Sequence, residues 1–179
     1  MTDKVTIFKN SGELLAKVTR EGRRVNFHRN EVELLDAFFN FCISAHSIRD
    51  WCIKELKLNE DEKNQFHESC NKHKYLEYVR DIANGSKHFG LDKNKKSTVE
   101  SVAACEASFT YMNITENILG KSENETTVKL LLPNGEDVFV FVFLNQVVRS
   151  LRSIMDNYGL PYDKYKCNPI NMSKVSSSQ

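Results

Sequence analysis

The stretch of sequence that decides the fold is YLEYVRDIANGSKHFGL, residues 75–91. Its apolar residues recur every three or four positions, which is the spacing of an amphipathic helix. Arg80, Asn84 and His88 stand four residues apart, with Lys87 beside the last of them. Residues at this spacing are neighbours on a helix surface, so these side chains can converge on one edge.

Gly85 stands among these polar residues. A glycine costs about 1 kcal/mol relative to alanine in a helix interior, so an ordinary surface helix would avoid it. We expect a helix over residues 73–88 that either ends at Gly85 or continues for a turn beyond it. In both cases Arg80, Asn84 and His88 can lie close together, and we expect the segment to carry a functional site.

A longer amphipathic helix is predicted over residues 30–56, because an asparagine cap and acidic residues begin it. Its apolar stripe is interrupted by His46 and Arg49, and Asp50 follows His46 by one turn. An unpaired buried arginine is prohibitively unfavourable, so Arg49 should meet a carboxylate, a ligand or a water-filled cleft. We expect His46 or Arg49 to contact residues 80–88, since buried polar groups need partners.

Residues 5–27 contain short apolar runs separated by Asn-Ser-Gly and Glu-Gly, which predict a small antiparallel β-meander. Residues 59–71 are polar and predict a short exposed helix that an asparagine caps. Its His67, Cys70 and the following His73 have no fourth ligand at useful spacing, so we expect no metal site there and no cofactor.

The second half of the chain alternates between β and helical patterns. Residues 98–112 are rich in β-formers and predict a strand. Asn134 and Gly135 separate two β-rich runs within residues 128–143, which is the strongest short-range hairpin signal. Apolar residues at helical spacing predict a last helix over residues 144–158.

These elements predict one α+β domain over residues 1–163. It would comprise N-terminal strands at 5–27, a helical core at 30–90, and a β hairpin with the last helix at 98–158. We expect the two long helices to pack antiparallel, with the last helix against them and the antiparallel sheet alongside. Residues 164–179 lose hydrophobic content and predict a disordered tail.

The chain has 179 residues and a formal net charge of +1, which fit one domain without a global attraction for nucleic acid or anionic lipid. Its five cysteines include no CxxC pair. That usage argues against a disulfide framework and favours a reducing, cytoplasmic setting. The N-terminus is no secretory signal, and the longest apolar run, residues 138–144, is too short to cross a membrane.

Two segments resemble a group of uncharacterised bacterial proteins. AHSIRDW at residues 45–51 matches a helix with histidine, arginine and tryptophan, and RDIANGSKHF at residues 80–89 matches an ANxSKH-type helix. The likeness covers residues 30–95. More distantly, the chain is similar to the HEPN superfamily of helical RNA- and nucleotide-binding domains. This resemblance implies an α+β fold built on a HEPN-like helical core.

Many members of that superfamily are metal-independent endoribonucleases of toxin–antitoxin and phage-defence systems. The resemblance implies that Arg80 is the superfamily's arginine, Asp81 the polar residue after it and His88 its histidine. The spacing from Arg80 to His88 is longer than is usual there, and the β segments are additions to its helical bundle. The implied partners are RNA or a nucleotide, a second copy of the chain, and an antitoxin or other protein.

RNA cleavage without a metal needs a base, an acid and a cation that stabilises the charge on the phosphorane. Histidine titrates in the range that the first two roles require, and arginine grips a phosphate through its planar fork. The candidate catalytic residues are His88, Arg80 and His46, and the candidate substrate-binding residues are Arg49, Asp50, Asn84 and Lys87.

The alternative is a non-enzymatic module that dimerises or binds a partner. In that hypothesis the two polar clusters form a buried network between the helices, made of His46, Arg49, Asp50, Arg80 and Asn84. The sequence leaves both hypotheses open, and with them whether the protein is an enzyme. An open basic cleft at Arg80 and His88 favours the ribonuclease, and carboxylate partners that seal both favour the module.

Overall fold

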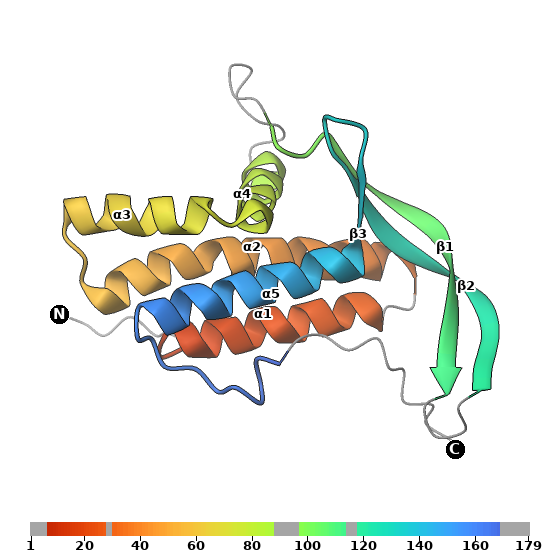
Figure 1. The fold of residues 1–179 in the computed structure, drawn as a ribbon, viewed down its shortest axis with the longest axis horizontal. Coiled ribbons are helices and arrows are strands. Elements are labelled where there is room, and N and C mark those ends of the chain that lie inside the picture. Colours follow the sequence, from red (N-terminus) through yellow and green to blue (C-terminus); the bar gives the residue numbers. More distant parts are fainter. Residues whose placement is uncertain (1–6, 28–29, 88–96, 114–117, 169–179) are drawn as a thin grey trace.

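The computed structural model describes residues 7–27, 30–87, 97–113 and 118–168 of the chain, and this part has a mixed α and β architecture (Figure 1). The α+β class predicted from the sequence is therefore confirmed. In chain order the elements are α1 (Ser11–Asn26), α2 (Glu31–Leu56), α3 (Glu60–Asn71), α4 (Lys74–Lys87), β1 (Ser101–Asn113), β2 (Ile118–Leu131), β3 (Asp137–Phe139) and α5 (Val140–Asn157).

Helices α1, α2 and α5 lie side by side, α3 and α4 lie on one side of them, and the sheet leaves from one end (Figure 1). The core fills the space between the three helices. Phe143 of α5 packs its ring against Phe38 and Phe41 of α2, with ring centroids 5.5 and 6.1 Å apart. Leu15 of α1 is fully buried in the same cluster. Burial of large side chains is the main favourable term in this packing.

Helix α1 overturns the predicted N-terminal meander. The expected strands at residues 5–27 are wrong over the described part, because residues 11–26 form one helix. The Asn-Ser-Gly segment begins this helix instead of making a turn: Asn10 is the N-cap, and its side chain accepts a hydrogen bond from the Glu13 N–H at 2.9 Å. Leu15 and Val18 then fall on the buried face at helical spacing.

The central helices follow the predictions closely. Helix α2 begins after the Asn30 cap, and α3 begins with a capping box between Asn59 and Glu62. Helix α4 continues past Gly85 to its last residue, Lys87, which decides between the two endings that the sequence allowed.

Helices α2 and α4 do not pack as a simple antiparallel pair. Their contacts run in the antiparallel sense, since Leu76 near the start of α4 meets Arg49 while Gly85 near its end lines the same pocket as Phe38. However, α4 is seen nearly end-on where α2 lies across the view, so the two axes cross steeply (Figure 1). The expected contact between the two helices is therefore present, in the antiparallel sense, but at a steep crossing.

The sheet is antiparallel with the order β1-β2-β3. Strands β1 and β2 pair from Ser101 with Leu131 to Asn113 with Ile118, and the register shifts between Thr110 and Met112. The predicted strand at residues 98–112 is thus confirmed within a few residues at its start.

The predicted hairpin exists but its second strand is shorter than expected. β2 pairs with β3 through the turn at Gly135, which adopts a φ of +81°. Residues 140–143 were expected to extend this strand and instead begin α5, so the predicted helix start at residue 144 is also wrong. Val140, Phe143 and Leu144 are buried at helical spacing, and their packing decides the conformation over local β preference.

The structured part of the chain continues past residue 164, where the tail was predicted to begin. The backbone N–H of Cys167 donates to the Asp163 carbonyl at 3.0 Å, and the Cys167 side chain is fully buried. The rest of the predicted tail, residues 169–179, lies outside the described residues. In the part of the chain that is described, no helix is both long and apolar enough to cross a membrane.

Gly12 supports the close approach of the C-terminal segment to α1. A Cβ placed there would lie 2.3 Å from the Pro161 carbonyl oxygen and 3.0 Å from the Tyr162 Cα, both backbone atoms. We expect Gly12→Ala to lower the free energy of unfolding by about 1–3 kcal/mol through overpacking, although alanine is the better helix former. Urea unfolding followed by circular dichroism measures the change. Arg20→Ala, at an exposed position of the same helix, is the control and should stay within about 0.5 kcal/mol of wild type.

Candidate functional site

Arg49 of α2 is buried, with 8 % of its surface exposed. Its Nη1 donates to the Asn71 Oδ1 at 3.2 Å, and its Nη2 donates to the Leu76 carbonyl at 3.5 Å. Asn71 ends α3 and Leu76 lies in the first turn of α4. The guanidinium therefore holds the α3–α4 junction against α2, using acceptors that the chain itself supplies.

Burial lowers the pKa of Arg49, and the positive charge of Arg80 lowers it further, while Cys70, Glu77 and Asp50 act in the opposite direction. An arginine stays charged at neutral pH despite such a shift. The charge of Arg49 is thus compensated by an amide oxygen, a backbone carbonyl and nearby acidic groups.

The other predicted residues of α2 do not join this arrangement equally. Asp50 is exposed and lines a separate shallow pocket with Lys54 and Lys57 on the far end of α2. His46 is half-buried one turn before Asp50. Helical spacing predicted that Asp50 and His46 lie on the same side of α2. In the structure the α3–α4 junction covers Arg49, whereas Asp50 is exposed to solvent.

Arg80 and Asp81 tie α4 to the chain that enters β1. The Arg80 Nε donates to the Asp81 Oδ1 at 2.9 Å, and the Arg80 Nη1 lies 3.9 Å from the Glu77 Oε1. The Asp81 Oδ2 accepts from the Thr98 N–H at 2.8 Å and from the Thr98 hydroxyl at 2.7 Å. The sequence gives no sign that Thr98 is the partner of Asp81, because no local pattern links residues so far apart.

The Asp81 carboxylate is buried, with 5 % of its surface exposed. Burial raises its pKa, but the hydrogen bonds from Arg80 and Thr98 and the charge of Arg80 outweigh this effect and leave the pKa below its usual value. Asp81 is therefore ionised at neutral pH and is stabilised by its three donors. It acts as an anchor for residues 97–100 and is not poised to exchange a proton near neutrality.

The remaining candidates stand at the end of α4. Asn84 is half-buried, and Lys87 is the last residue of the helix. The Lys87 side chain and the whole of His88 lie outside what the structure describes. The expected contact of Arg49 with residues 80–88 is limited to the effect of the Arg80 charge, because the hydrogen bonds of Arg49 go to Asn71 and Leu76.

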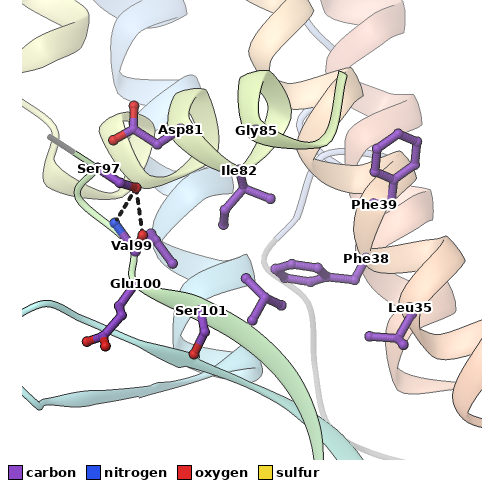
Figure 2. A pocket seen from close by; sticks show the side chains of 11 residues that line it. Leu35, Phe38, Phe39, Asp81, Ile82, Gly85, Ser97, Val99, Glu100 and Ser101 are labelled. Carbon is purple, nitrogen blue, oxygen red and sulfur yellow. Dashed lines mark hydrogen bonds between the residues drawn. The ribbon is translucent and has the colours of Figure 1, made fainter. Parts of the chain in front are cut away.

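A pocket of about 460 Å³ lies between α2, α4 and the start of β1 (Figure 2). Phe38 and Ile82 point into it, and the side chains of Asp81 and Glu100 lie at its edge. Its described lining contains these two carboxylates and no cation. The lining residues are Leu35, Phe38, Phe39, Asp81, Ile82, Gly85, Ser97, Val99, Glu100, Ser101 and Val102.

The sequence patterns did not predict this pocket. Leu35 and Phe39 lie on the apolar stripe of α2 and Phe38 widens it, which is the pattern of a core face. In the structure Phe38 is buried, but Phe39 keeps 41 % of its surface exposed. The sequence does contain a sign of the pocket: the first turns of α2 carry several large apolar residues, and the neighbouring elements do not cover all of them.

The buried cysteines of α2 and α3, Cys42, Cys52 and Cys70, do not supply reactive thiols. Burial raises the pKa of Cys52 to about 12 and that of Cys70 to about 11, and it also raises the pKa of Cys42. Thiols with such values are almost fully protonated near neutral pH and are poor nucleophiles. Within the described ranges, no three His, Cys, Asp or Glu side chains gather in a group that could hold a metal ion.

No family model, curated protein or solved structure matches the chain. The resemblance to the HEPN superfamily therefore stays a prediction.

The position of Arg49 predicts a structural effect. Arg49→Ala would leave the Asn71 amide oxygen and the Leu76 carbonyl without this donor, at about 1–3 kcal/mol for each buried group left unsatisfied. We therefore expect a clear fall in melting temperature, measured by circular dichroism. Asp50→Asn, one residue along and exposed, should leave the melting temperature nearly unchanged. Equal melting temperatures for Arg49→Ala and wild type would contradict the assigned role.

The depressed pKa of Asp81 predicts a pH-dependent stability. Its pKa is lower in the folded than in the unfolded chain, so its contribution is present above the unfolded value of about 3.9 and is lost as the pH falls through the folded value. Asp81→Asn should thus lower stability at pH 7, and the difference from wild type should shrink below about pH 4. Urea unfolding at pH 7 and in acid measures it. Glu100→Gln, an exposed carboxylate at the same pocket, is the control; a gap that does not change with pH would refute the assignment.

Proposed function

We propose that the protein is a non-enzymatic interaction module. Arg49, Arg80 and Asp81 stabilise its fold, and the pocket between α2, α4 and β1 receives an apolar segment of a polypeptide. The observation that carries this proposal is that both arginines expected to grip a phosphate are engaged by groups of the chain itself.

Recruiting Arg80 to a phosphate would have an energetic cost. Its Nε is the donor to the Asp81 Oδ1, and a buried acceptor that loses its partner costs about 1–3 kcal/mol. Glu77 also competes for the guanidinium. A phosphate that drew the guanidinium away from these two carboxylates would have to compensate both losses. Arg80 is therefore better suited to orient Asp81 than to hold RNA.

The pocket has the wrong chemistry for a polyanion and the right chemistry for an apolar group. Its described charged residues are acidic: Glu100 is exposed and repels phosphates, and Asp81 is already paired with Arg80. Apolar pockets with a few polar groups at the edge are typical of sites that bind apolar side chains or ligands. Phe39 exposes much of its ring beside this pocket and gives an incoming apolar segment a further surface.

The ribonuclease hypothesis makes a competing prediction that one assay decides. Purified wild type, incubated with total RNA in EDTA, should leave the RNA intact if the proposal holds. Arg80→Gln should lower the melting temperature because Asp81 loses a charged donor, whereas His88→Ala should not alter RNA integrity at all. Gel electrophoresis of the RNA and thermal unfolding of each variant give the two readouts.

Cleavage by wild type in EDTA that His88→Ala abolishes would refute the module and favour a metal-independent ribonuclease. Cleavage that disappears in EDTA would instead indicate a metal-dependent nuclease. The Arg80→Gln variant tests the structural role of Arg80 separately, because the proposal predicts that it lowers the melting temperature whether or not the protein acts on RNA.

A further inference from the structure

Three apolar residues of α2, here called the α2 stripe, extend the pocket into a longer apolar surface. Leu35 and Phe39 line the pocket, and Val32 lies one turn before Leu35 on the same face of the helix. Val32 and Phe39 keep 69 % and 41 % of their surface exposed. The described elements therefore leave much of the α2 stripe uncovered, and it continues the apolar lining of the pocket along the helix.

The dimensions of this surface suit a polypeptide segment. The pocket of about 460 Å³ alone is typical in size of a site for one small ligand. The α2 stripe adds about 10 Å along the helix axis, since Val32 and Phe39 are two turns apart. A small molecule that filled the pocket would leave Val32 exposed. A segment of polypeptide with two apolar side chains covers both parts of the surface.

Carboxylates lie on both sides of this surface. Glu100 lines the pocket across from α2, is exposed and makes no ion pair with a described residue (Figure 2). Asp36 stands on α2 between Leu35 and Phe39, is also exposed, and has no ion-pair partner in the described part of the chain. These two negative charges are therefore left for a partner to compensate.

The described cations near Asp36 do not remove its charge. Arg23 and Arg24 line the neighbouring pocket together with Asp36. However, Arg24 is paired with the buried Glu21, and neither arginine forms an ion pair with Asp36. The described lining of the larger apolar pocket contains no cation at all. An apolar surface bordered by carboxylates is complementary to an apolar segment bordered by cations.

We propose that the occupant is a segment of a partner protein that carries two large apolar side chains with basic side chains beside them. The apolar side chains fill the pocket and cover the α2 stripe, and lysine or arginine side chains pair with Glu100 and Asp36. This inference rests on the proposed interaction function and names the chemistry of its partner. An acidic segment is selected against, because it brings like charges together at both positions.

The two kinds of contact contribute differently to binding. Large apolar side chains that enter a pocket supply most of the affinity of such interfaces. Exposed ion pairs each strengthen binding by at most about fivefold, and their effect weakens as salt rises. Binding should therefore depend strongly on Phe39 and moderately on the charge of the partner.

Three synthetic peptides serve as probes for the full chain. They share one apolar face of leucine and phenylalanine at helical spacing and differ only in the flanking residues, which are lysine, glutamine or glutamate. Fluorescence anisotropy measures the binding of each labelled peptide. We expect wild type to bind the lysine peptide most tightly and the glutamate peptide most weakly, with a difference that shrinks as salt is added.

Two variants separate the apolar from the charged contribution. Phe39→Ala should weaken the binding of all three peptides by at least about fivefold, because part of the apolar surface is lost. Asp36→Lys combined with Glu100→Lys should reverse the order of the lysine and glutamate peptides, and loss of folding cannot produce that gain. Glu68→Lys combined with Glu136→Lys makes the same change in charge at exposed positions outside the pocket, and this control should keep the wild-type order.

The outcomes separate this inference from the proposed function. Peptides that need Phe39 but show no preference among the flanking residues, or that prefer glutamate, overturn the basic partner and leave the interaction module standing. Binding that Phe39→Ala leaves intact also overturns this inference, because the peptides then bind elsewhere. Binding of none of the peptides overturns both. A wild type that is a dimer by light scattering, and that Phe39→Ala converts to a monomer, would make the occupant a second copy and overturn the separate partner.

Discussion

The buried carboxylate of Asp81 is the constraint on which the rest of the site depends. It loses the solvation of water and is stabilised by Arg80 and by two hydrogen bonds from Thr98. Thr98 begins the short connection to β1, so the position of Asp81 on α4 fixes where the ribbon starts. The pocket depends on that attachment, because α4 lines one side of it and Ser97 and residues 99–102 line another.

The sequence could predict that Arg49 and Arg80 need partners but not which partners they have. A buried arginine in an apolar stripe requires acceptors, and a ligand, a carboxylate or a backbone carbonyl satisfies it equally well. Arg49 uses Asn71 and Leu76, which become neighbours only once α3 and α4 have folded back on α2. The need of a buried arginine for partners is therefore visible in the sequence, while the partners themselves depend on contacts that no local pattern encodes.

The same division applies to the fold. Capping signals at Asn30 and Asn59 are local, and the helices they begin were predicted closely. The segment at Asn10 is equally local but fits either a turn or a helix cap, and the buried face of α1 decides between them. The run from Val138 alternates like a strand and also repeats like a helix. There the tertiary packing of Phe143 against α2 selects the helix after only three strand residues.

The buried charge of Asp81 and the exposed edge strand β1 are connected through the chain between them, which the hydrogen bonds from Thr98 to Asp81 hold rigid. Association loses free energy when loops and side chains must be ordered, so a strand that is already fixed binds with less cost than a flexible one. Asp81 and Thr98 order the entry to β1 before any partner arrives. A hydrophobic contact at this point would hold the chain less directionally, since apolar packing lacks the fixed geometry of hydrogen bonds. Under the proposed function, the polar cluster of Arg80, Asp81 and Thr98 keeps the entry to β1 and the pocket beside it in one conformation.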